Sequence, residues 1–240
     1  MATPPIRWPA APAKLKVTVQ LLKMQWLDLL FAHWRIDAEL LRPLIPDALE
    51  VDLWAGEAWI GVVPFRMRGV GLQFLPGGTS FAELNVRTYV RHRGRAGVWF
   101  FSLDAASKLG VRLARRFFHL PYFDARMSIE TAGDGFRYRS ERTHRGAPAA
   151  GLEMTYSPAG PPMTPSPLEE WLTARYSLFS ADAEGHLYRG DVAHTPWQLQ
   201  PAVAEFERLE MGFPLGGAPA SLLFSKCLDV RASALVRIDE

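Results

Sequence analysis

Three kinds of residue are scarce or badly placed in this sequence for several common chemistries. It has a single cysteine, Cys227, so an internal disulfide is excluded. No two histidines stand at metal-ligand spacing, so we expect no metal. Lysine is rare: the five lysines are Lys14, Lys16, Lys23, Lys108 and Lys226. Chemistry that needs a side-chain amine therefore has few candidates.

Long hydrophobic runs are also lacking. The first 14 residues have no apolar stretch of the kind a secretory signal carries, and the most apolar early run, residues 21–34, is interrupted by four polar side chains. We therefore expect neither an export signal nor a membrane span. Together with the lone cysteine, this favours a reducing cytoplasm as the location.

The sequence also has no large excess of positive or negative charge. Lys and Arg number 27 against 25 Asp and Glu, a formal net charge of +2. Proteins that bind nucleic acid are usually far more basic, so we expect no nucleic-acid partner and no membrane partner. A small-molecule ligand is the expected partner, and assembly into a homo-oligomer is left open.

The content of the chain favours a β-rich globular fold. At 240 residues and 48% hydrophobic, it can bury one sizeable core. The Pro- and Ala-rich residues 1–14 predict a loose arm, and residues 15–240 a single domain. FAELNVRTYV, a turn and VWFFSLDA read as a hairpin of two long strands. Further strands and a few short helices predict a mainly β class with α additions.

Three helices are expected. Asp37 is a candidate N-cap for a short helix that ends before Pro43. Residues 105–118 have apolar residues spaced by three and four, which is typical of a helix. Ser166 and Glu169 form a capping box that predicts a helix over residues 168–178.

The first hairpin strand carries the most informative polar pattern. Side chains alternate along a strand, so Glu83, Asn85, Arg87 and Tyr89 share one face. This face can simply be wetted by solvent, as is common for antiparallel sheets. Alternatively it lines a barrel interior, where an acid, an amide and a guanidinium would hold a small polar ligand such as a carboxylate.

The second hairpin strand offers Ser102 and Asp104 on a common face with Phe100. If the register matches, these polar groups lie beside the polar row of the first strand. Asp104 has a second interpretation, because an Asp just before a helical segment is a common N-cap.

Other candidates have weaker signals. His33 lies among apolar neighbours and is more often a hydrogen-bonded structural residue in such a setting. Arg116 falls on the same helix side as Leu109 and Leu113, so it can point inward instead of joining a solvated basic face. Cys227, in an apolar run, is expected to be a buried thiol. No nucleophile elbow or phosphate loop is present, and no cofactor is expected.

The order of several segments resembles the YqjF-like proteins, a bacterial family related to acetoacetate decarboxylase. The resemblance covers nearly the whole chain. The segments that carry it are AHWRIDAELLRPLIPDALEVD, FAELNVRTYV, GVWFFSLDA, RRFFHLPYFDARM, LTARYSLF and HTPWQLQ.

The resemblance implies a cone-shaped β-barrel or curved double sheet that encloses a ligand cavity. In the decarboxylases a Pro-Lys-Lys tripeptide supplies the lysine that forms a Schiff base. The matching residues here are Pro121, Tyr122 and Phe123, none of which has an amine. Glu83 matches a glutamate that lines the decarboxylase site. Decarboxylation by the Schiff-base route is therefore not expected.

Two functions remain open at this stage. The first is a barrel that binds a small carboxylate or hydrophobic metabolite. The second is a lyase, isomerase or hydrolase that works by non-covalent acid/base catalysis, with Glu83 as base and Tyr122 as acid. The expected ligand-binding residues are Glu83, Asn85, Arg87, Ser102, Arg116, Tyr122 and His33.

Overall fold

The computed structural model describes residues 20–239. The arm expected over residues 1–14 lies outside the described residues. The strands are β1 (Gln20–Ile36), β2 (Glu50–Val51), β3 (Ala58–Leu72), β4 (Thr79–His92), β5 (Arg95–Ala105), β6 (Tyr122–Ala132), β7 (Gly135–Arg142), β8 (Gly151–Pro158), β9 (Ser177–Ala181), β10 (Leu187–His194), β11 (Gln200–Glu210), β12 (Ser221–Ser233) and β13 (Val236–Arg237). The helices are α1 (Ala38–Leu41), the 3-10 turn η1 (Arg42–Leu44), α2 (Lys108–Phe118) and α3 (Pro167–Thr173).

Within residues 20–239, the strands form one strongly curved sheet. Its order is β13-β10-β9-β5-β6-β7-β8-β11-β12-β1-β3-β4-β2, with further pairings of β4 with β5 and of β10 with β12. These extra pairings bring the sheet back onto itself, which leaves fewer strand edges unpaired. The prediction of a mainly β class with helical additions is confirmed.

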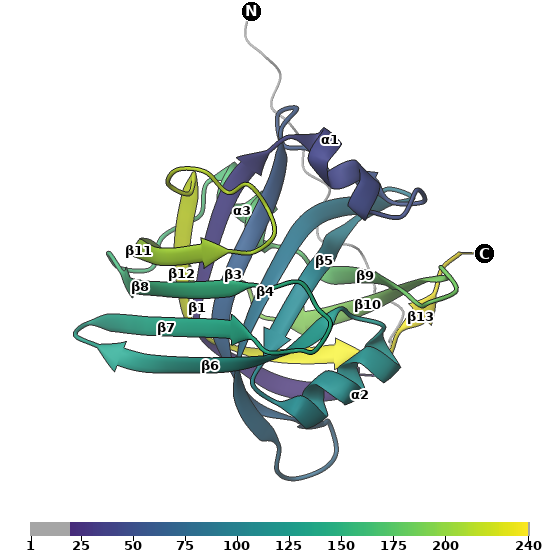
Figure 1. The fold of residues 1–240 in the computed structure, drawn as a ribbon, viewed down its shortest axis with the longest axis horizontal. Helices are drawn as coiled ribbons and strands as arrows, with labels where there is room; N and C mark the ends of the chain where they lie inside the picture. Colours follow the sequence, from purple (N-terminus) through teal and green to yellow (C-terminus); the bar gives the residue numbers. More distant parts are fainter. Residues whose placement is uncertain (1–19, 240) are drawn as a thin grey trace, which may run out of the picture.

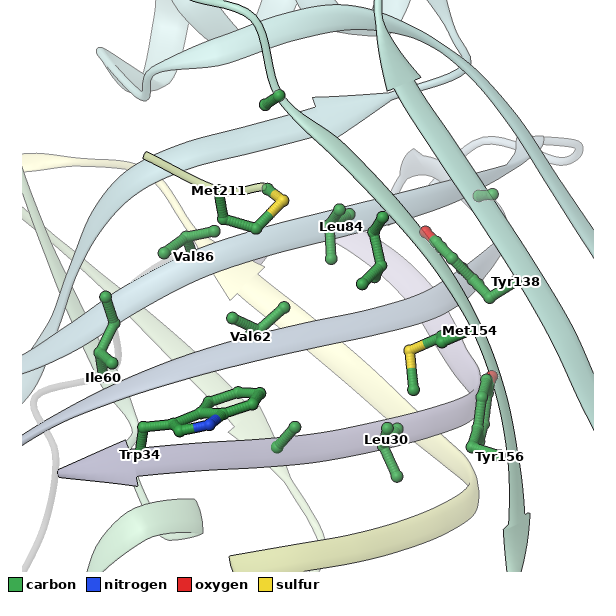
Figure 2. Close-up of a cluster of buried hydrophobic side chains, with 14 of the residues drawn as sticks. Leu30, Trp34, Ile60, Val62, Leu84, Val86, Tyr138, Met154, Tyr156 and Met211 are labelled. Atoms are coloured by element: carbon green, nitrogen blue, oxygen red, sulfur yellow. The ribbon is translucent and has the colours of Figure 1, made fainter. Parts of the chain in front are cut away.

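Two layers of this sheet pack against each other. β6, β7, β8 and β11 lie in front of β1, β3, β4 and β12 and cross them steeply (Figure 1). Between the layers lies the largest apolar cluster, to which β4 contributes Leu84 and Val86 and the front layer Tyr138, Met154 and Tyr156 (Figure 2). One face of β4 is thus occupied by the core, and the other face turns away from it.

The hairpin of β4 and β5 forms as the sequence predicts. His92 pairs with Arg95, and the two residues between them, Arg93 and Gly94, have φ values of 48° and 79°. A two-residue loop with both φ values positive matches the right-handed twist of the strands it joins. β4 pairs with β3 on its other side, so it is held by hydrogen bonds along both edges.

The helices follow their capping residues, with two corrections. Asp37 caps α1 by accepting from the Glu39 amide. α2 begins later than predicted, at Lys108, because β5 continues to Ala105 and Ser107 is the N-cap. α3 has the predicted capping box but ends at Thr173 instead of residue 178. It ends early because the chain enters β9 at Ser177, where it pairs with β10, and the Arg175 side chain before it pairs with Asp52.

Cys227 does not behave as predicted. It lies on β12 opposite Leu27 and is exposed, because it borders an open groove that Lys226 and Arg66 also line. Among the described residues, no helix is long and apolar enough to cross a membrane.

Candidate functional site

The polar row of β4 lies inside the protein. Glu83, Asn85 and Arg87 are 1%, 5% and 9% exposed, and Tyr89 is fully buried. Since Leu84 and Val86 point into the core between the layers, alternation places the polar row on the opposite face. The interpretation of this face as solvent-wetted is therefore wrong, and shielding of Glu83 and Arg87 agrees with the interior interpretation.

β1 and β3 add a histidine and a glycine to this face. His33 on β1 is opposite Gly61 on β3, and Gly61 is opposite Arg87 on β4. A Cβ at Gly61 would lie 3.2 Å from His33 Cδ2 and 3.5 Å from the Tyr89 hydroxyl. The imidazole and the phenol therefore occupy space that a larger side chain on β3 would fill.

Glu83 is hydrogen-bonded to Tyr122. The Tyr122 hydroxyl donates to Glu83 Oε2 over 2.9 Å. Burial raises the pKa of the Glu83 carboxyl to about 8; the hydrogen bond from Tyr122 opposes this shift, and the negative charge of Asp104 adds to it. Burial and the nearby Glu83 hold the pKa of Tyr122 well above its usual value. At neutral pH both groups carry their protons.

Arg87 has aromatic neighbours and, within the described part of the chain, no acidic partner. Its guanidinium carbon lies 5.2 Å from the centre of the Phe31 ring. Among the ion pairs of residues 20–239, none includes Arg87. Its Nε and Nη2 atoms are buried and lack a hydrogen-bond partner. A buried charge without a counter-charge is costly, so this arrangement favours an anion.

Further polar atoms on this face lack partners as well. Both ring nitrogens of His33 and Oδ1 of Asn85 are buried without a hydrogen bond, and so is Nε1 of Trp59, two positions before Gly61. Burial and the charge of Arg87 hold the pKa of His33 well below its usual value, so the imidazole is neutral and has one N–H. Donors outnumber acceptors here, which suits a ligand rich in acceptor oxygens.

Ser102 does not join the row. It is buried, but it pairs with Val86, whereas Arg87 pairs with Phe100. Phe101 is therefore an extra residue on β5. Such a bulge shifts the alternation by one and turns Ser102 toward the core face.

Asp104 also faces the core side and pairs with Arg142, Oδ1 to Nε over 2.8 Å. Both side chains are buried. Asp104 is thus part of an ion pair between the layers and not a helix cap.

Arg116 does not join the row either. It lies in the exposed last turn of α2, with its guanidinium over the Phe117 ring. The expectation that it points inward is not met. The neighbouring Arg115 of this helix instead donates to the backbone carbonyl of Tyr122 over 2.8 Å.

Two residues of the site were missed in the sequence. Phe31 stacks on His33, with ring centres 5.9 Å apart. Gly61 leaves room for the His33 ring and the Tyr89 hydroxyl. Strand alternation from His33 to Phe31 was a usable signal. Nothing in the sequence marked Gly61, because its role depends on which strand lies beside β3.

One cluster of metal-ligand residue types was also missed. Asp182, Glu184 and His186 in the β9–β10 hairpin have ligand atoms within 4.8 Å of one another. Asp182 Oδ1 already accepts from two backbone amides, and Oδ2 contacts the His186 ring and the Tyr188 hydroxyl. These bonds account for the cluster as a turn, and we assign no metal to it.

Two open grooves lie away from the row. They have volumes of about 610 and 490 Å³ and share Arg66. Their linings include Ala82 of β4 and Phe136 of β7, but not Glu83, Asn85 or Arg87. The polar row is therefore separate from these surface grooves.

Comparison with solved structures defines the class of protein. The fold is similar to acetoacetate decarboxylase from Legionella pneumophila (TM-score 0.66, 14% identity, covering 95% of this chain and 91% of the other). It is also similar to an acetoacetate decarboxylase-like enzyme from Sphingomonas wittichii RW1 (TM-score 0.62, 13% identity, 95% and 99% covered). The enduracididine biosynthesis enzyme MppR has a TM-score of 0.62 at 13% identity, with 92% and 89% covered. The chain has an acetoacetate decarboxylase-like fold.

The sequence comparisons give the family. Residues 23–228 match DUF2071, described as an uncharacterized conserved protein. The uncharacterized protein YqjF from Bacillus subtilis (strain 168) is 43% identical over 192 residues, 78% of each chain. This chain belongs to the DUF2071 family, which confirms the resemblance to the YqjF-like proteins.

Proposed function

We propose that this chain is a small-molecule-binding protein whose interior site, built on Glu83, Asn85 and Arg87, holds a small carboxylate or hydrophobic metabolite. One observation carries the proposal: Arg87 is buried, has no acidic partner among the described residues, and has two nitrogen atoms without a hydrogen bond. A carboxylate would satisfy both nitrogens at once. The Phe31 ring beside it suits a flat or apolar ligand body.

The proposal includes binding without a Schiff base. Tyr122 and Phe123 take the positions of the lysine pair in the resembled decarboxylases. Lys23, Lys108 and Lys226, the lysines within residues 20–239, are half-buried or exposed. Lys14 and Lys16 lie outside the described residues, so borohydride trapping is part of the test.

The test is ligand-induced stabilisation. Benzoate, pyruvate and acetoacetate are added in series, and the rise in melting temperature is recorded. Arg87→Gln should abolish the rise given by an acid that stabilises the parent chain, whereas Arg116→Gln, which changes an exposed arginine, should keep it. An equal rise in parent and Arg87→Gln protein rejects the site. A borohydride-trapped adduct with acetoacetate rejects non-covalent binding.

A second function has its own supporting observation. The Tyr122–Glu83 hydrogen bond, with a carboxyl pKa of about 8, suits a general base paired with a neutral acid. We infer a candidate acid/base enzyme that exchanges protons next to a carbonyl group. Deuterium exchange into pyruvate or acetoacetate, followed by proton NMR, should accelerate as the pH rises through 8 and stop in Glu83→Gln. Exchange that persists in Glu83→Gln rejects this function.

We also propose that the protein works in the cytoplasm on a small molecule, without nucleic-acid or membrane partners. The exposed thiol of Cys227 supports a reducing location, since such thiols oxidise elsewhere. The near-balanced charge supports the absence of polyanion binding.

A further inference from the structure

The interior site is closed on the side of its strands. His33, Glu83 and Asn85 are at most 5% exposed. β4 is hydrogen-bonded to β3 and β5, and β1 to β3 and β12. Opening any of these strands would break a ladder of hydrogen bonds. Arg87 is 9% exposed, so a molecule can reach its unbonded nitrogens fully only if a segment outside the strands moves.

Residues 195–199, between β10 and β11, are such a segment. They form neither helix nor strand, and Thr195, Pro196 and Gln198 are exposed. Trp197 points the other way and is half-buried. Its indole N–H donates to the carbonyl oxygen of Thr173, at the end of α3, over 3.0 Å.

Trp197 packs on the ring that touches the site. Its ring meets Phe31 edge-on with centres 4.9 Å apart, and it stacks on Trp26 with centres 5.8 Å apart. Phe31 in turn contacts the guanidinium of Arg87 and the imidazole of His33. A single aromatic ring thus separates Trp197 from Arg87, and Trp197 borders the exposed part of its segment.

We propose that Trp197 is the gate of the interior site. Leu199 is buried beside Phe31 and its carbonyl accepts from Met163, so it stays in place. When residues 195–198 swing outward, the indole leaves Phe31 and its bond to Thr173, which opens a route from solvent to Arg87. The closed position is the one in this structure. This inference rests on the proposed function, because it assumes that the space beside Arg87 is where a ligand binds.

The test measures access to Arg87 without any ligand. Phenylglyoxal reacts with arginine side chains, and the modified peptides can be quantified by mass spectrometry. Arg142 is the internal control, because its side chain is only 8% exposed and lies on the core face of the sheet, ion-paired with Asp104. In Trp197→Ala, modification of Arg87 should accelerate about tenfold, while that of Arg142 stays the same.

A milder variant guards against loss of folding. Trp197→Phe keeps a ring against Phe31 but loses the bond to Thr173, so it should accelerate modification of Arg87 by a smaller factor. Trp34→Phe is the matched control: it also loses an indole bond to a carbonyl, that of Gly217, but on the core face of β1. It should leave the reactivity of Arg87 unchanged.

The opposite results overturn the gate. The gate is rejected if the rate of Arg87 modification is unchanged in both Trp197 variants. It is also rejected if the modification rates of Arg87 and Arg142 rise in parallel, since that reports general loosening of the fold. The gate is rejected as well if Trp34→Phe accelerates the modification of Arg87 as much as Trp197→Phe does. Failure of the proposed function looks different: added benzoate would then not protect Arg87, whatever the Trp197 variants do.

Discussion

The hydroxyl of Tyr122 donates to the carboxyl of Glu83 across 2.9 Å, and this bond ties the first residue of β6 to the first member of the interior row on β4. Tyr138 donates to the backbone carbonyl of the same glutamate over 2.7 Å from the other face of β4. Glu83 is therefore held from both sides of the strand. Its side chain meets the interior, and its backbone is anchored to the core.

The pKa of Glu83 predicts a specific loss of stability with rising pH. The folded-state pKa of about 8 exceeds the ordinary value of 4.5, so the folded protein holds a proton that the unfolded chain has lost. The resulting stabilisation is complete below pH 4.5 and disappears as the pH rises through 8. Between pH 5 and 8 the parent protein should lose about 1.4 kcal/mol per pH unit relative to Glu83→Gln. Urea unfolding at several pH values measures this difference, and parallel curves for the two proteins would contradict it.

Removing the Tyr122 hydroxyl should raise the pKa of Glu83 further. The hydrogen bond favours the ionised carboxylate, so Tyr122→Phe shifts the pKa above 8 and costs about 1 kcal/mol of folding free energy. Tyr138→Phe is the matched control, because it removes a bond to the backbone of Glu83 and leaves its carboxyl untouched. NMR titration of carboxyl-labelled glutamate distinguishes the two. The same upward shift in both variants would show that the Tyr122 bond is not the cause.

Replacing Gly61 by alanine should cost less stability than replacing Gly97, but it should weaken ligand binding. In Gly61→Ala the new Cβ meets the edge of the His33 ring at 3.2 Å, a contact that a small ring movement relieves. In Gly97→Ala it lies 2.7 Å from the backbone oxygen of Ser177, which cannot move independently of its strand. We expect a cost of about 1 kcal/mol for Gly61→Ala and about 3 kcal/mol for Gly97→Ala in chemical denaturation.

Gly61→Ala should also weaken ligand-induced stabilisation, because the new methyl group lies between His33 and Arg87. If it stabilises the protein with unchanged ligand response, His33 does not lie over Gly61 as described.

Removing only one partner of the Asp104–Arg142 ion pair should destabilise the protein. Both side chains are buried, at 1% and 8% exposure, so Asp104→Asn leaves a buried guanidinium without its counter-charge. A cost of about 3–5 kcal/mol is expected, and Asp104→Leu combined with Arg142→Met should recover much of it. Thermal and urea unfolding of the single and double variants tests this. Additive losses in the double variant would mean that the two residues do not act as a pair.

The polar row of the site could be predicted because it depends on one strand alone. In residues 81–90 the alternation of polar and apolar side chains places Glu83, Asn85 and Arg87 on one face in any sheet. The hairpin and the N-caps at Asp37 and Ser166 are equally local, since the residues that form them are within a few positions of one another.

Features that depend on other strands could not be predicted. Ser102 was assigned to the wrong face because the extra residue Phe101 shifts the register, and β-bulges have no clear sequence signal. The end of α3 differs from the prediction because Ser177 and Leu178 pair with β10 as part of β9, a contact that the helical pattern does not reveal. Arg116 was expected inside, although it lies on the outer side of α2.

Which side chains share a face of β4 follows from their order along the strand, because backbone geometry imposes a period of two. Closure of this face does not follow from the sequence, since it comes from distant segments: β1 adds His33, and the Leu172 carbonyl of α3 accepts from the Tyr89 hydroxyl. The packing of distant strands buries Arg87 beside Phe31 and His33, and none of the ion pairs of residues 20–239 includes it. The physical reason is desolvation: burial removes the water that would otherwise solvate the guanidinium, and so creates the requirement for an anion.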